Sequence, residues 1–296
     1  MAGIVEKELS FQFTLGEGQF GETGSNTTTV KGLRASVEID QPGGVTMATG
    51  SMKIYGMTKA MMDQLSTLGQ IVTTVRKNTI SVMAGDVGAT LSTVFDGTIF
   101  NAYGDYNQAP NVPFVVDASS GFFNAIAPTP STVLKGAVPV TTMLRNLATT
   151  MGARFEGNGV TATLTNAHYY GSAWRQAAAI VHDAGLEWNG AFNNVLAVWN
   201  PGESRGGAVP IVQPPPDGGM IGYPSFFPLG IQVRNTYDPA FVFGRPIQVK
   251  SSLKGASGKW IVAGIHHSLE SQSPGGKWET LMKAAPVGYG PIVPSS

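Results

Sequence analysis

The sequence contains no cysteine, and this absence removes several kinds of chemistry at once. Disulfides, thiol nucleophiles, iron–sulfur clusters and zinc sites built on cysteine are all excluded. Histidine is also scarce, with four residues in 296, so a histidine-based metal site has little material. We therefore expect no metal and no cofactor.

Charge is in short supply too. Charged residues make up 13% of the chain, against roughly 25% in ordinary soluble domains. The 19 Lys and Arg residues balance the 19 Asp and Glu residues, so the formal net charge is zero. A neutral surface protects weakly against self-association, which favours an oligomer. No basic run is present, and this argues against a dedicated nucleic-acid-binding protein.

Long apolar runs are missing as well. The longest, such as residues 261–265, fall far short of the roughly 18 residues that a membrane span needs. Near the start of the chain, Glu6, Lys7 and Glu8 stand where a signal peptide would place its apolar stretch. We expect a soluble protein without a secretory signal.

Glycine and proline, in contrast, are plentiful, with 38 and 19 residues spread along the whole chain. Short strands joined by many turns produce this distribution, so a mainly β protein is expected. Residues 35–40 alternate apolar and polar side chains, as in a half-buried strand, and residues 41–44 then turn the chain. Residues 94–100 contain Asp96-Gly97, which fits either a two-residue hairpin or a bulge within one long strand.

Three short amphipathic helices are predicted between the strands. The first has Thr58 as its N-cap and Gly69 as its end. The second begins near Val140 and ends at Gly152, and the third runs from a Ser172 cap to Gly185. Their apolar stripes contain these residues: Met61, Leu65 and Leu68; Val140, Leu144, Leu147 and Met151; Trp174, Ala177, Val181 and Ala184. Each stripe predicts packing against a sheet.

The second and third helices belong to a predicted small α+β module at residues 136–199. Its expected strands are residues 160–164, 186–188 and 195–199. A proline-rich passage at residues 201–224 follows, and it predicts a boundary without regular structure. The expected β segments after it are residues 230–233, 246–251, 260–267 and 278–282.

No constellation of side chains predicts catalysis or metal binding. His266 and His267 with Glu270 are the nearest approach to a metal cluster, but adjacent residues on a strand point to opposite faces. Asp183 and Glu187 flank a helix end near Trp188 and are the best candidate acid pair for a cell-wall hydrolase. With 19 acids in the chain, chance alone produces such a pair.

Aromatic side chains near the proline-rich passage are candidates for an interface. Phe226 and Phe227 lie between Pro224 and Pro228, in what the sequence predicts to be a loop with at least one ring facing outward. Tyr223 lies just before it. Exposed rings of this kind mark a partner surface more often than a catalytic one. We take Tyr223, Phe226 and Phe227 as interface candidates.

The order and spacing of many short motifs resemble a baseplate hub protein from contractile-tailed bacteriophages. In the C-terminal part they are residues 220–224, 230–233, 244–252, 258–262, 266–269 and 274–278. In the N-terminal part they are residues 52–56, 81–85, 95–99 and 113–118, and between these parts are 171–172 and 184–185. Asp86 departs from the pattern, because many relatives have an aromatic residue there.

The resemblance implies two tube-type β-barrel domains plus a small α+β module. The first barrel would be residues 1–117, the second residues 118–135 with 200–288, and the module 136–199; residues 289–296 form a C-terminal tail. Phe122, Phe123 and Ile126 would supply a strand to the second barrel.

In function, the resemblance implies a structural subunit without enzymatic activity. A homotrimer would form a pseudo-sixfold ring in the virion tail baseplate, assembled in the host cytoplasm. The ring would join a tail tube or tube-initiator protein to a central spike, beside other baseplate proteins. Two alternatives stay open: another tube-like or distal tail component of the same particle, and a cell-wall hydrolase using Asp183 and Glu187.

Overall fold

A computed structural model describes residues 5–21, 24–44, 46–67 and 77–288. The chain forms two compact units. Unit 1 comprises Met1–Asp40, Ala48–Phe123 and His267–Glu279, and unit 2 comprises Gln41–Met47, Asn124–His266 and Thr280–Ser296. The predicted fold class, mainly β with a small α+β part, is confirmed. The predicted barrel boundaries remain a prediction, and the predicted tail at 289–296 lies outside the described residues.

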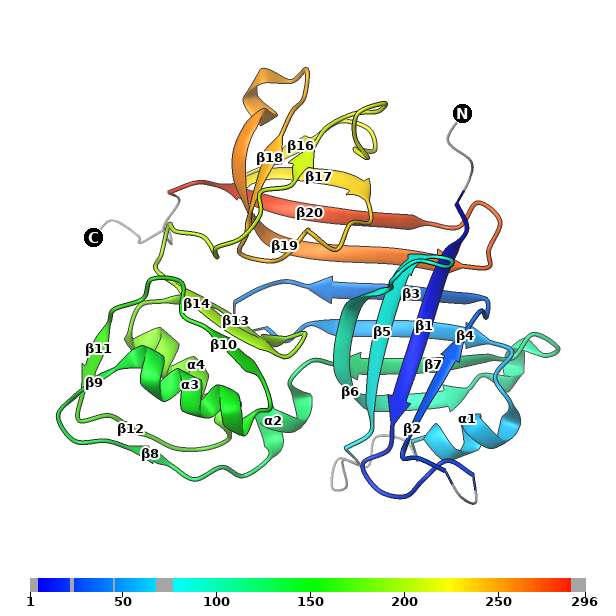
Figure 1. Cartoon of the computed structure of the whole chain (residues 1–296), viewed down its shortest axis with the longest axis horizontal. Helices are drawn as coiled ribbons and strands as arrows, with labels where there is room; N and C mark the ends of the chain where they lie inside the picture. Colours follow the sequence, from blue (N-terminus) through cyan, green and yellow to red (C-terminus); the bar gives the residue numbers. More distant parts are fainter. Residues whose placement is uncertain (1–4, 22–23, 45, 68–76, 289–296) are drawn as a thin grey trace. The chain divides into compact units, whose positions relative to one another are not determined.

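Unit 1 is built on an antiparallel sheet with the order β3-β4-β7-β6-β5-β1-β2 (Figure 1). Its strands are β1 Lys7–Thr14, β2 Thr27–Lys31, β3 Ala35–Gln41, β4 Thr49–Tyr55, β5 Thr79–Asp86, β6 Ser92–Gly104 and β7 Pro113–Ser119. Burial alternates along β3 and β4, as the sequence pattern predicted. Asp86, the departure from the hub pattern, pairs with Lys7 of β1.

Residues 94–100 belong to one long strand, β6, so Asp96-Gly97 is not a hairpin. The register along β5 shifts so that Val94 is an extra residue, and the register along β7 shifts so that Phe100 is another. Two bulges therefore flank the Asp96-Gly97 pair. A Cβ on Gly97 would lie 2.6 Å from the Phe95 ring, which explains the glycine.

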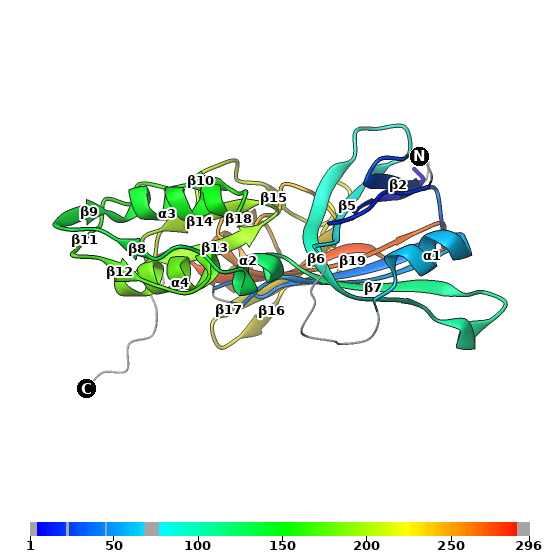
Figure 2. The ribbon, with the colours of Figure 1, turned by 90° about the horizontal axis from the view of Figure 1, so that it is seen from below.

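Helix α1, Lys59–Leu65, begins at the predicted Thr58 cap and packs against β6 (Figure 2). The predicted end at Gly69 is wrong, because the helix stops at Ser66. The Ser66 hydroxyl and backbone N–H both donate to the Met62 carbonyl, and the Ser66 backbone is extended. Leu68 and Gly69 lie outside the described residues. The buried face of the helix consists of Met62 and Leu65.

The strand predicted at Phe122, Phe123 and Ile126 is also wrong. These residues form a short helix, α2, Phe122–Ile126. Gly121 precedes it with a φ of 73°, and this left-handed turn ends β7 and starts the helix.

Two predicted helices of the α+β module are confirmed in unit 2. They are α3 Val140–Thr150 and α4 Ala173–Asp183, and α4 has the predicted Ser172 cap. Gly152 and Gly185 follow them with φ values of 70° and 63°. The module's strands are β8 Thr132–Val133, β9 Ala137–Pro139, β10 Arg154–Glu156, β11 Thr163–Thr165, β12 His168–Tyr169, β13 Glu187–Phe192 and β14 Val195–Trp199. The strand expected at 160–164 thus begins only at Thr163.

Strand β14 lies between β10 and β13 and is buried along its whole length. Its side chains alternate between two hydrophobic cores. Leu196 and Val198 pack with the module's helices. Val195, Ala197 and Trp199 pack with the strands that follow in the sequence.

The remaining strands of unit 2 are arranged in the order β16-β17-β20-β19, and β18 pairs with both β15 and β19. Their bounds are β15 Ile211–Val212, β16 Ser225–Phe227, β17 Gly230–Thr236, β18 Pro246–Val249, β19 Gly258–Ser271 and β20 Trp278–Pro286. Strands β19 and β20 have residues in both units. Two 3-10 turns complete the elements, η1 Tyr106–Gln108 and η2 Lys254–Ala256.

The prediction that the proline-rich passage lacks regular structure is wrong, because β15 lies within it. This two-residue strand pairs in parallel with β18. Both of its residues are β-branched, both retain a backbone donor, and Val212 is fully buried. No helix in the described part of the chain is long and apolar enough to cross a membrane.

The amide of Gln176 joins α4 to the segment before β8, and we predict that it is essential for stability. The side chain is fully buried. Its oxygen accepts from the Thr132 N–H and hydroxyl, and its nitrogen donates to the carbonyls of Pro130 and Gly171. Gln176→Leu leaves these groups buried without partners, so we expect the free energy of unfolding to fall by about 3 kcal/mol.

Urea denaturation measures this effect, with Arg175→Gln as the matched control on the exposed side of the same helix turn. The control should change stability by less than about 0.5 kcal/mol. Equal stability of the two variants would show that the Gln176 network is dispensable.

Candidate functional site

The candidate interface residues form a short strand and the turn before it, instead of the predicted loop. Strand β16 pairs with β17, with Phe226 opposite Ile231 and Phe227 opposite Gly230. Pro224 and Pro228 lie just outside it, where their missing donors break no pair. The sequence predicted a loop at residues 224–228 because a strand of only three residues is too short to show an alternating pattern.

The two phenylalanines point to different places. Phe226 is 61% exposed and Tyr223 71% exposed, whereas Phe227 lines a cavity inside unit 2. Adjacent residues of a strand alternate in direction, which explains the difference. Ile221 and Leu229, in the segments that flank β16, are exposed as well, and the sequence analysis missed both; Leu229 also lines the cavity. Together, Tyr223, Phe226, Ile221 and Leu229 are termed the apolar edge.

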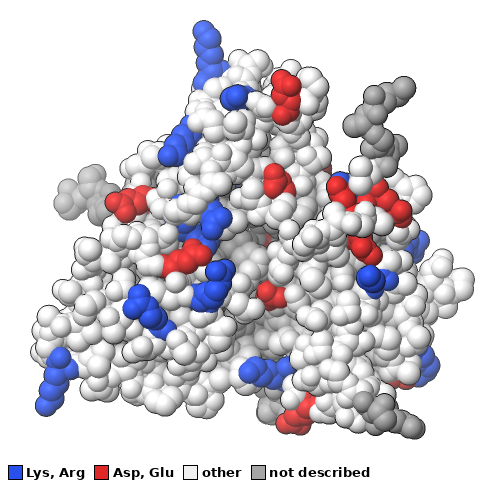
Figure 3. Space-filling view, viewed as in Figure 1, with Lys and Arg blue, Asp and Glu red and all other residues white. Residues whose placement is uncertain are grey.

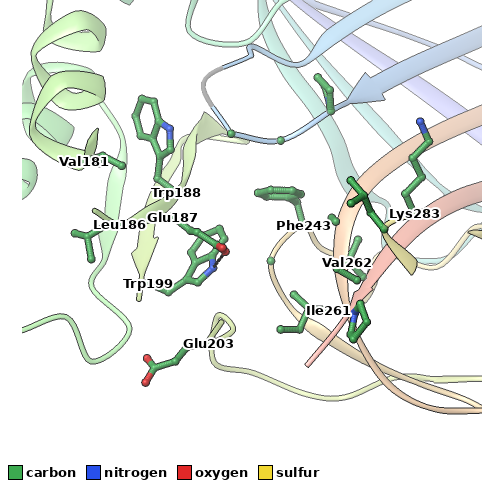
Figure 4. A pocket seen from close by; sticks show the side chains of 18 of the residues that line it. Val181, Leu186, Glu187, Trp188, Trp199, Glu203, Phe243, Ile261, Val262 and Lys283 are labelled. Atoms are coloured by element: carbon green, nitrogen blue, oxygen red, sulfur yellow. Dashed lines mark hydrogen bonds between the residues drawn. The ribbon is translucent and has the colours of Figure 1, made fainter. Parts of the chain in front are cut away.

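The cavity has a volume of about 630 Å³. Its walls come from β13, β14, α4 and the C-terminal strands, and Figure 4 shows the side chains that converge on it. Most of the lining is apolar, including Trp188, Trp199 and Phe243. The charged groups at its walls are Glu187, Glu203 and Lys283.

Glu187 is the acid most deeply placed in the cavity wall. Its Oε2 accepts a hydrogen bond from Trp199 Nε1 at 2.7 Å (Figure 4). Burial raises the pKa of Glu187, and the hydrogen bonds from Trp199 and the Gly202 backbone oppose this shift.

Asp183, the partner proposed for Glu187 in a hydrolase, has a different environment. Its carboxylate accepts a hydrogen bond from the Tyr169 hydroxyl at 2.8 Å, and this bond, with a smaller effect of His182, lowers the pKa of Asp183. Burial and the same bond raise the pKa of Tyr169 to about 12. Glu187 is a lining residue of the cavity and Asp183 is not, so the structure does not assemble this acid pair.

The histidine pair lies on β19, with His267 buried and His266 half-buried. Their different burial agrees with the expectation that adjacent strand residues face opposite ways. Among the described residues, no group of three His, Cys, Asp or Glu side chains is placed to hold a metal ion.

Another charged group escaped the sequence analysis. Arg205 is 3% exposed, and its Nη2 and Nε donate to Glu156 Oε2 at 2.7 and 3.2 Å. Its Nη1 donates to the Phe243 carbonyl at 3.1 Å. Arg205 is 49 positions from Glu156 and 38 positions from Phe243, so no local sequence signal points to these contacts.

The sequence matches no protein-family model and no curated protein. Solved structures are similar in fold. A tail protein from Neisseria meningitidis MC58 matches with a TM-score of 0.62 and 10% identity, over 95% of this chain and 97% of that one. The 43 kDa tail protein of prophage MuSo2 from Shewanella oneidensis matches with a TM-score of 0.56 and 8% identity, over 95% and 99%.

A third structure comes from a secretion system. The E. coli c3393 protein is described as a type VI secretion component with structural similarity to the T4 tail proteins gp27 and gp5. It matches with a TM-score of 0.56 and 10% identity, over 88% of this chain and 76% of that one. The chain therefore has the fold of phage tail proteins of this type. The resemblance to a baseplate hub protein seen in the sequence is confirmed at the level of the fold.

The buried position of Glu187 generates a prediction about pH. Because the pKa of Glu187 is raised in the folded state, protonation of Glu187 favours folding. This contribution to stability is complete below the ordinary carboxyl pKa of about 4.3, and it is lost as the pH rises through the folded-state pKa. Glu187→Gln stays neutral and can still accept from Trp199. The variant should therefore melt higher than the parent at pH 7, and this advantage should shrink toward pH 4.

Differential scanning calorimetry across this pH range tests the effect. Glu203→Gln is the matched control, because this exposed carboxylate lines the same cavity. A Glu187→Gln effect on the melting temperature that does not vary with pH would contradict the assignment.

Proposed function

We propose that this chain is the structural hub subunit of a contractile tail baseplate. Three copies would form a pseudo-sixfold ring that joins the tail tube, or a tube-initiator protein, to the central spike. The observation that supports this most strongly is the fold match to two phage tail proteins over at least 95% of each chain. Because the match spans nearly the whole length of each chain, it is more specific than a match to one shared domain.

The surface chemistry supports a subunit that is covered on several sides. The chain has few charges and no net charge, which leaves association weakly opposed. The apolar edge provides exposed aromatic rings, a side-chain type that is enriched at energetically important interface positions. We infer a structural role without enzymatic activity, since Asp183 and Glu187 bind different partners.

The first test is the mass of the assembly in solution. Sedimentation equilibrium and native mass spectrometry over micromolar concentrations should show a trimer, because a specific interface of ordinary size persists in this range. Hexamers or open polymers would favour a tube component instead. A monomer at every concentration would contradict the hub assignment.

The apolar edge gives a second test, because its two phenylalanines have different environments. We expect Phe226→Ala to weaken trimer formation by about 2 kcal/mol, roughly thirtyfold, the usual scale for an aromatic interface anchor. Phe227→Ala removes a ring that lines the cavity of the same chain, so it should lower the melting temperature of the dissociated subunit.

Melting is measured below the dissociation constant of the parent trimer, since assembly itself raises the apparent stability. Tyr223→Ala should behave as Phe226→Ala does, because its ring is exposed as well. A large fall in subunit stability for Phe226→Ala, with trimer formation intact, would remove the apolar edge from the interface.

A further inference from the structure

Three of the eight arginines in the chain lie near one another in unit 2, and one of them pairs with a glutamate. They are Arg154, Arg205 and Arg245, and the acid is Glu156. Arg154 and Glu156 are two apart on β10, so their side chains leave the same face of the strand. Blue side chains gather around a red one over the region of β10 in Figure 3.

The contacts of Arg205 hold this group together. Its side chain bonds both Glu156 and the Phe243 carbonyl, and its backbone N–H donates to the Gly244 carbonyl, directly before Arg245. Arg245 in turn lies beside Gly207: a Cβ at that glycine would be 3.1 Å from its guanidinium carbon. Arg205 and Arg245 are therefore placed by the fold of the chain, and the backbone of exposed Arg154 is fixed by the pairing of β10 with β14.

The turn that carries Arg205 is fixed from a second side. The Asn158 side chain accepts from the Gly206 N–H at 3.1 Å and donates to the Val198 carbonyl at 3.1 Å. Asn158 lies two residues after the end of β10, so the turn is tied to the strand that carries Arg154 and Glu156.

The charges of this group do not balance. Glu156 neutralises Arg205, and the side chains of Arg154 and Arg245 have no acidic or hydrogen-bonding partner among the described residues. The Nε atom of Arg245 is buried without an acceptor. Burial lowers the pKa of Arg205, Glu156 raises it, and the charges of Arg245 and Arg154 lower it further. An excess of two positive charges thus stands in a chain whose net charge is zero.

We propose that Arg154, Arg205, Arg245 and Glu156 form a binding site for an acidic segment of another protein. Guanidinium groups bind carboxylates through paired, charge-assisted hydrogen bonds, and Glu156 on Arg205 is an example within the site itself. A nucleic acid fits less well. Binding a phosphate backbone takes many basic contacts, and this site has three arginines and one acid in a chain without a basic run. The site is independent of the proposed hub role.

The experiment uses the full chain and a fluorescein-labelled hexaglutamate peptide, with binding measured by anisotropy at low salt. We expect saturable binding that weakens at least tenfold in Arg154→Gln/Arg245→Gln and weakens as salt rises. Arg175→Gln/Lys135→Gln is the matched control: it removes the same charge at two exposed positions elsewhere in unit 2 and should leave binding unchanged.

Three outcomes would overturn the site. They are no saturable binding, equal loss in both double variants, and tighter binding of an oligothymidine of equal charge that is lost in the same variant. Circular dichroism and sedimentation of every sample establish that the variants are folded and report their assembly. A trimer that does not bind the peptide refutes the site alone, and a monomer that binds it refutes the hub proposal alone.

Discussion

The architecture of unit 2 depends on a strand, β14, that has no exposed face. Its five residues pack alternately into the core around α3 and α4 and into the core of the C-terminal strands. A register shift of one residue would exchange the two sets of side chains, so the register is strongly specified. The Trp199 ring restricts the register of β14 further. It lies against Gly244, where a Cβ would come within 2.7 Å of the ring.

Polar groups buried near this strand are paired across long sequence distances. Gln41 donates to Asn189 Oδ1 at 2.8 Å, and Arg205 bonds Glu156 and the Phe243 carbonyl. Such pairs add little net stability, but leaving one partner unpaired is costly, so they select a single arrangement of the segments that carry them. In unit 2 this constraint fixes the turn that carries Arg205.

Local signals in the sequence predicted the elements that are determined locally. The Thr58 and Ser172 caps and the glycines after α3 and α4 act within a few residues of their helices, and the structure has each of them. The errors have two causes: a pairing with a distant strand, and a glycine turn whose local effect the sequence analysis missed. Strand β15 exists because β18 pairs with it, and the residues around β15 supply no hint of that pairing. The strand expected at 122–126 fails because Gly121 redirects the chain.

The same distinction applies to the two candidate surfaces. Tyr223, Phe226 and Phe227 are close in sequence, so aromatic composition between prolines was enough to identify them, although only strand pairing separates an outward Phe226 from a Phe227 that faces the cavity. Arg154, Arg205 and Arg245 come from three separate segments and could not be grouped without the fold.

If both act as interfaces as proposed, these two surfaces have complementary physical roles. Apolar aromatic area supplies affinity with little directional preference, whereas fixed charges supply orientation and reject wrong partners. A chain with only 13% charged residues has few positions with which to encode orientation. Concentrating three arginines at one place, with Arg205 fixed by Glu156 and the Phe243 carbonyl, gives those few charges a defined direction, which a scattered distribution of the same charges would not.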